Sequence, residues 1–96
     1  MVDDRLDKIK MALVPLLWRR GVRRAAIFGS FACGEARRDS DLDLLVDIGK
    51  EYSLLDIVRL RRESEERLER RVDLVEYEAI KPALRDRVIS EQVPIL

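Results

Sequence analysis

The chain has 96 residues, the length of one small domain, and a domain of this size buries roughly 60–65% of the surface of its unfolded chain. Its composition, 47% hydrophobic and 40% charged, predicts one core inside a charged surface and excludes a disordered segment. Lys plus Arg balances Asp plus Glu at 19 each, so any attraction to phosphate has to be local, and binding to nucleic acid or a membrane is not expected. We therefore expect a single domain over residues 1–96.

The cysteine and histidine content removes several kinds of chemistry. Histidine is absent and Cys33 is the only cysteine, so the chain cannot form a Ser-His-Asp triad, an HExxH zinc site or an internal disulfide. Metal ligands would have to be oxygens, which favour magnesium or manganese. No apolar run approaches the roughly 20 residues of a membrane span, and the N-terminus lacks a signal-peptide pattern. These features predict a cytoplasmic protein.

The hydrophobic pattern predicts alternating helices and strands. Pro15 interrupts the first helix, and the second strand alternates carboxylates with leucines, as a half-buried strand should. The expected order is helix, strand, short helix, strand, helix, strand and helix, over residues 3–20, 22–28, 31–36, 41–48, 54–70, 72–75 and 82–92. This order predicts an α/β (α+β) domain with a small mixed sheet of three to four strands and helices packed mainly on one side.

The carboxylates of the second strand are the first candidates for chemistry. Asp41 and Asp43 are two residues apart on that strand, so their side chains leave the same face and can reach a common cation. Burying this pair among leucines would be costly without a compensating charge, which a bound metal ion would supply. An exposed edge with both acids turned to solvent would give the same spacing.

Two further sequence features accompany the pair. Gly29-Ser30 follows an apolar strand, where the glycine lets the backbone approach a ligand and the serine hydroxyl can face an anion such as a triphosphate. Asp73 lies in the next apolar strand, and three carboxylates could hold two metal ions if that strand is a neighbour. An ordinary turn and an ordinary strand-end residue are the alternatives for these two features. The P-loop and GxGxxG motifs are absent.

The run from Gly29 to Val46, GSFACGEARRDSDLDLLV, followed by Asp73 in a later strand, resembles the DNA polymerase β-like nucleotidyltransferase superfamily. More narrowly, it is similar to the minimal nucleotidyltransferases (MNT, MntA-like antitoxins) of prokaryotes, and the resemblance in length covers nearly the whole chain. It implies the nucleotidyltransferase fold. It also implies that Gly29 and Ser30 hold ATP and that Asp41, Asp43 and Asp73 hold divalent ions, Mg²⁺ or, as the alternative, Mn²⁺.

The resemblance further implies transfer of AMP to a tyrosine of a HEPN-domain toxin, within a hetero-oligomer in which this chain is the antitoxin. One residue departs from the family pattern, since Cys33 stands where the family usually has arginine. Arg37 or Arg38 would then have to supply the missing positive charge. The departure keeps a second hypothesis open, a binding antitoxin that neutralises its partner by occlusion with little or no catalysis. Transfer to a small molecule or an RNA end is a third.

Two other groups of residues have a structural and a functional interpretation. The aromatic residues Trp18, Tyr52 and Tyr77 and the apolar tail 93–96 are expected mainly to pack in the core or at sheet edges, with a partner surface as the alternative. The helix over residues 54–70 is rich in arginine, but interleaved glutamates neutralise it, so a solvated helix is favoured over an RNA-binding face.

Overall fold

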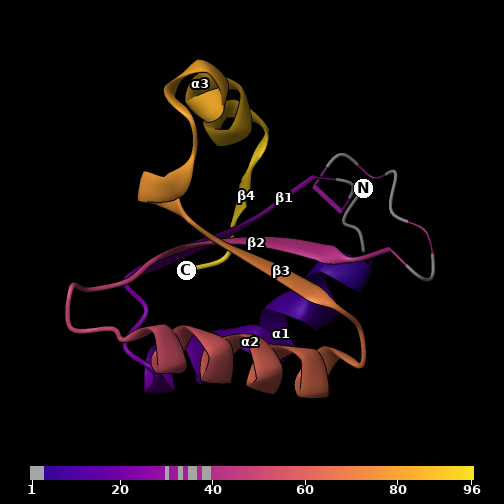
Figure 1. Cartoon of the computed structure of the whole chain (residues 1–96). Helices are drawn as coiled ribbons and strands as arrows, with labels where there is room; N and C mark the ends of the chain where they lie inside the picture. The colour runs from indigo at the N-terminus through magenta and orange to yellow at the C-terminus, as the bar shows by residue number, and fades with distance from the viewer. Residues whose placement is uncertain (1–3, 30, 33, 35–36, 38–39) are drawn as a thin grey trace.

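The computed structural model describes residues 4–29, 31–32, 34, 37 and 40–96, so that Ser30, Cys33 and Arg38 lie outside the described residues. Four strands form one sheet in the order β3-β2-β1-β4, and three α-helices pack against it (Figure 1). No helix in these described ranges is long and apolar enough to cross a membrane.

The sheet is mixed. Its strands are β1 (Arg24–Phe28), β2 (Leu42–Asp47), β3 (Val72–Glu76) and the short β4 (Val93–Pro94). The β1 strand runs antiparallel to both β2 and β4, whereas β2 and β3 are parallel. Parallel neighbours need a crossover connection, and here it is the helix between β2 and β3.

Helices cover both faces of the sheet unequally. The α1 helix (Asp4–Arg19) and the α2 helix (Leu54–Leu68) lie side by side below the sheet in Figure 1, while α3 (Pro82–Glu91) lies on the other side. The side chain of Arg20, just after α1, pairs with Glu63 of α2. Two helices on one face agree with the expectation of a sheet covered mainly on one side.

The main core lies between β1, β2 and the helix pair. Fully buried leucines of α1 pack there against alternate residues of β2, and the residues concerned are Leu13, Leu16, Leu17, Leu42, Leu44 and Val46. A smaller cluster on the opposite face joins Ala26 and Leu45 to Ile80, with Val88 of α3 packed against it. Because strand side chains alternate between faces, β2 supplies both clusters.

The ends of α2 are defined by local interactions. Ser53 accepts a hydrogen bond from the Asp56 amide at 3.1 Å, and the Asp56 carboxylate accepts one from the Ser53 amide at 2.9 Å, which together form a capping box. At the other end Glu69 takes the left-handed conformation, with φ 53°, and its amide donates to the Glu65 carbonyl. The helix therefore ends two residues before the predicted position.

Some predicted features differ from the structure. The tail forms β4 beside β1, and a short 3₁₀ helix, η1 (Tyr77–Ala79), follows β3. The helical turn predicted over residues 31–36 falls partly outside the described residues, and its described members Phe31, Ala32 and Gly34 lie in turns. The packing prediction is wrong for Trp18, whose side chain is 73% exposed on α1.

Candidate active site

The β2 strand separates core residues from candidate functional residues. Leu42, Leu44 and Val46 point toward the two helices and are fully buried, whereas Asp43 lies on the opposite face and is half-buried. Asp41, two residues earlier, is exposed and precedes the first residue of the strand. The packing of the leucines thus decides which way the carboxylates face.

Asp73 joins them from the neighbouring strand. Asp43 and Asp73 are register partners in the parallel pair formed by β2 and β3. Neighbouring strands are about 4.8 Å apart, and partnered residues point to the same face. The Leu42 amide donates to the Arg71 carbonyl at 2.9 Å and starts this pairing. The strand that bears Asp73 is therefore the neighbour of the strand that bears Asp43, which is the condition for their carboxylates to share a metal site.

The electrostatics of the group centre on Asp43. Desolvation by burial raises the pKa of its carboxyl above the ordinary value, and the nearby carboxylates of Asp73 and Asp41 raise it further. Each of these effects disfavours the charged form of Asp43. A cation beside the three carboxylates would reverse this disadvantage.

Gly29 lies directly against this group. It follows β1 with φ 73°, and a Cβ placed on it would overlap Asp43 Oδ2 and lie 3.1 Å from Asp43 Cγ. Only glycine combines this backbone conformation with such a close approach to the carboxylate. Ser30, the other residue predicted to bind nucleotide, lies outside the described residues.

The donor set fits a hard divalent cation. Asp41, Asp43 and Asp73 offer only carboxylate oxygens, the ligands preferred by magnesium, and the raised pKa of Asp43 reflects first its burial and then the nearby negative charges of Asp73 and Asp41. Across residues 4–29 and the other described segments, no three acidic or sulfur side chains surround one point as a complete ligand set.

The sequence pattern does not predict the position of Arg70. Helical spacing places this arginine on a solvated helix face, but in the structure Arg70 follows α2, is half-buried and donates from Nη1 to the Ser40 carbonyl at 2.8 Å. Ser40 immediately precedes Asp41, so this arginine contacts the segment that leads into the carboxylate group. No periodicity in the sequence predicts this contact, because it depends on the left-handed residue Glu69.

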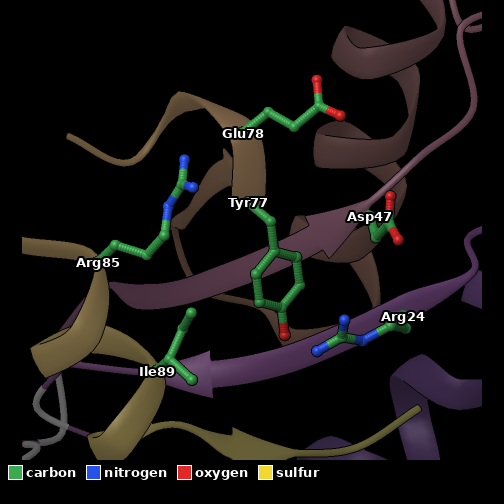
Figure 2. Close-up of a pocket in the computed structure, with 6 residues that line it drawn as sticks. All are labelled: Arg24, Asp47, Tyr77, Glu78, Arg85 and Ile89. Atoms are coloured by element: carbon green, nitrogen blue, oxygen red, sulfur yellow. The ribbon is translucent and has the colours of Figure 1, made fainter. Parts of the chain in front are cut away.

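A separate depression of about 260 Å³ lies on the same sheet face, beside α3. Figure 2 shows the Tyr77 ring in its middle, with Arg24 and Asp47 on one side and Arg85 and Ile89 on the other. The Arg24 guanidinium carbon is 4.9 Å from the centroid of that ring. Asp47 is four residues beyond Asp43 on β2, about 13 Å along the strand. The depression is therefore distinct from the carboxylate group.

The sequence profile of the family described as "Polymerase beta, Nucleotidyltransferase" matches residues 12–96. The chain therefore belongs to this family, and the class of protein that the fold and the carboxylate group define is the nucleotidyltransferase.

Two individual relatives and a solved structure are also similar to this chain. A Methanocaldococcus jannaschii protein, provisionally named protein adenylyltransferase MJ0435, is 46% identical over 91 residues, covering 95% of this chain and 98% of its own. The protein adenylyltransferase MntA of Thermococcus cleftensis is 43% identical over 75 residues, covering 78% and 76%. A solved structure of a provisionally assigned minimal nucleotidyltransferase is 43% identical, with a TM-score of 0.83 over 95% of this chain and 93% of that one.

A more distant structure shares the fold. It contains an MNT antitoxin in complex with a tri-AMPylated HEPN toxin from Shewanella oneidensis, and it aligns with a TM-score of 0.72 at 17% identity, over 94% of this chain and 71% of that chain. The predicted nucleotidyltransferase fold is confirmed by these comparisons.

Proposed function

We propose that this chain transfers AMP from ATP to a hydroxyl of a partner protein, with magnesium held by Asp41, Asp43 and Asp73. The observation that carries the proposal is the register of Asp43 with Asp73, beside Gly29, on the sheet face that α1 and α2 leave uncovered. Partly buried carboxylates close to one another are costly for the folded chain, and binding of a metal–nucleotide complex would offset that cost.

The names of the relatives favour a protein as the acceptor. Two relatives above 40% identity bear the name protein adenylyltransferase, one of them provisionally, and the distant structure holds a modified HEPN toxin. The acceptor that we propose is a tyrosine of a HEPN-domain toxin, for which this chain acts as the antitoxin in a hetero-oligomer. The reaction belongs in the cytoplasm, where ATP and magnesium are available.

The transfer is an in-line substitution at phosphorus. The acceptor oxygen forms a bond to the α-phosphorus, the bond from that phosphorus to the bridging oxygen breaks, and pyrophosphate leaves. Bound magnesium would supply charge compensation on the triphosphate and the leaving group. Gly29 lets the chain approach the phosphates, and the Asp73 carboxylate accepts the proton of the acceptor hydroxyl. Most of the acceleration then comes from positioning and electrostatic stabilisation.

The test compares two aspartates of one strand. The purified chain, Asp43→Asn and Asp47→Asn are each incubated with α-labelled ATP, magnesium and a candidate HEPN partner, and label in the partner is measured. Asp47 is a matched control because it lies on the same strand and face but belongs to the separate depression. We expect Asp43→Asn to lose about 100-fold or more of the transfer rate, while Asp47→Asn stays close to the unmodified chain.

The alternative function is neutralisation of the partner by occlusion. It predicts that a folded Asp41→Asn, Asp43→Asn double variant still neutralises the toxin in cells and that no label is transferred by any form. The exposed Trp18 and Met11 of α1, 73% and 77% accessible, favour a protein-binding surface under either function. Neutralisation by the folded double variant would support occlusion, and loss of neutralisation would support catalysis.

A further inference from the structure

Arg70 occupies an unusual position at the end of α2. Glu69, with φ 53°, reverses the chain after the helix, so that Arg70 turns back toward the sheet just before β3 begins at Val72. The Arg71 carbonyl accepts from the Leu42 amide at 2.9 Å, which holds this short connection beside the start of β2. Arg70 is consequently tied to the strand pair that bears the carboxylates.

The guanidinium of Arg70 touches both ends of the segment between the nucleotide-binding residues and the metal-binding residues. Its carbon lies 4.7 Å from the centroid of the Phe31 ring, and its Nη1 donates to the Ser40 carbonyl at 2.8 Å. Phe31 is two residues after Gly29, and Ser40 is one residue before Asp41. One planar group thus spans the two attachment points of a ten-residue stretch.

The two contact points differ in burial. Phe31 is only 2% exposed and belongs to the main core, so its ring is a fixed platform for the guanidinium. Arg5 lies over the same ring at 5.8 Å. Ser40 lies outside any helix or strand and is half-buried. Its amide donates to the Arg37 carbonyl at 3.1 Å, its hydroxyl accepts from the Arg37 amide at 2.7 Å, and its carbonyl accepts from Arg70. Arg70 therefore links a loop residue to the core.

We propose that Arg70 is a positioning residue for the nucleotide site, which fixes the distance between Gly29 and Asp41 by linking Phe31 to Ser40. This inference rests on the proposed function, because the site that it positions is the one proposed to hold ATP and magnesium. Arg70 acts through other residues and is not a catalytic residue. The planar guanidinium is required, since a lysine has the charge but can neither stack on the ring nor direct a bond in the same plane.

The consequence of losing Arg70 is a smaller population of the binding-competent arrangement. Apparent ligand affinity falls in proportion to that population. The loss of one stacking contact and one hydrogen bond by a charged group corresponds to about a tenfold weakening of ATP binding. Saturating ATP restores the arrangement, so we expect KM for ATP to rise about tenfold while kcat changes by less than about threefold.

The experiment compares Arg70→Gln and Arg70→Lys with a matched control, Arg67→Gln. Arg67 lines the same depression as Phe31 and Arg70 and also donates to a backbone carbonyl, but to that of Ala12 in α1, at 3.3 Å, instead of that of Ser40. Two quantities are measured for each folded variant: the affinity for a fluorescent ATP analogue with magnesium, and amide hydrogen exchange over residues 29–43 without nucleotide or partner. We expect both Arg70 variants to weaken affinity and to accelerate exchange, and Arg67→Gln to do neither.

Three outcomes would overturn the proposal. They are unchanged exchange over residues 29–43 in Arg70→Gln, an equal loss of ATP affinity in Arg67→Gln, and full affinity in Arg70→Lys, which would leave only a charge effect. The exchange measurement requires neither ATP nor transfer. If the unmodified chain transfers no AMP, the proposed function fails, while the exchange data still decide whether Arg70 fixes this segment.

Discussion

Gly29 lies against the carboxylate of Asp43 so closely that a Cβ on Gly29 would overlap Oδ2, at the end of the Asp43 side chain. The two residues belong to the neighbouring strand ends of β1 and β2, where Phe28 is the register partner of Asp43. A backbone position proposed to accept phosphate and a carboxylate proposed to accept metal are thus one contact apart. A substitution of Gly29 therefore tests the proposed site.

Gly29→Ala should weaken nucleotide binding for two reasons, the positive φ of residue 29 and the overlap with Asp43. Gly21→Ala is the matched control, because Gly21 has φ 75° but nothing within 4 Å of an added Cβ. Both variants are expected to lose about 1–2 kcal/mol of stability through backbone strain. Only Gly29→Ala should weaken binding of an ATP analogue, by at least about tenfold, as measured by fluorescence titration. Equal binding by the two variants would contradict the proposed site.

Asp43→Asn should make the metal-free protein more stable at neutral pH. Folding raises the pKa of Asp43, so its stability contribution is fully present below the unfolded pKa and is lost as the pH rises through the folded pKa. Ionised Asp43 therefore destabilises the folded state at neutral pH, and asparagine removes this effect. Urea unfolding with a chelator should show the variant ahead at pH 7 and the difference shrinking as the pH falls through the folded pKa toward the unfolded one.

Magnesium should reverse that order. An ion that binds only the folded state raises its stability by mass action, and it binds better when Asp43 is ionised. Thermal unfolding with added magnesium is expected to raise the Tm of the unmodified chain more than that of Asp43→Asn. Asp47→Asn should respond to magnesium as the unmodified chain does, because Asp47 lies at the far end of β2. Identical magnesium responses in all three proteins would argue against a metal site at Asp43.

Glu69→Gly should stabilise the fold. Glu69 ends α2 with φ 53° and ψ 40°, a conformation that costs a residue with a side chain more than it costs glycine. After subtraction of the greater flexibility of glycine in the unfolded chain, the expected gain is about 0.5–1 kcal/mol in urea unfolding. Glu66→Gly, inside the same helix, is the control of opposite sign and should lose about 1 kcal/mol.

Leu44→Ala should destabilise the protein strongly. Leu44 is completely buried between β2 and the helix pair, and a cavity there is expected to cost about 3 kcal/mol. Leu54→Ala makes the same chemical change on a residue that is 79% exposed, and it should stay within about 0.5 kcal/mol of the unmodified chain. Chemical denaturation at one temperature measures both. Similar losses at the two positions would contradict the assignment of the core.

Much of the fold follows from local patterns in the sequence. The alternation along β2 predicts a strand with two different faces, and Ser53 with Asp56 marks the start of α2 through paired hydrogen bonds. The β4 strand was not predicted, because two residues at a sheet edge carry no periodicity. Its pairing with β1 depends on tertiary contacts, such as the burial of Ile95.

The candidate site also contains residues that local patterns predict and one residue that depends on tertiary contacts. Asp41, Asp43 and Asp73 were predicted from spacing within strands, and the register of β2 with β3 brings the last two together as partners. The role of these residues as metal ligands remains a prediction. Arg70 could not be predicted, since its contact with Ser40 spans 30 residues and requires a left-handed residue that is not glycine. Local sequence patterns therefore predict site residues within helices and strands better than residues whose contacts join distant parts of the chain.

The alternation along β2 has a consequence for errors in folding. A slip of β2 by one residue against β1 would turn Asp43 into the apolar layer and Leu44 out of it, because the side-chain period of a strand is two. The hydrophobic penalty against such a slip also protects the chemistry. A molecule that buries the leucines of β2 in the core also has Asp43 on the opposite face of the sheet. A population of this protein should therefore contain active folded copies and unfolded copies, but few copies that are well folded and inactive.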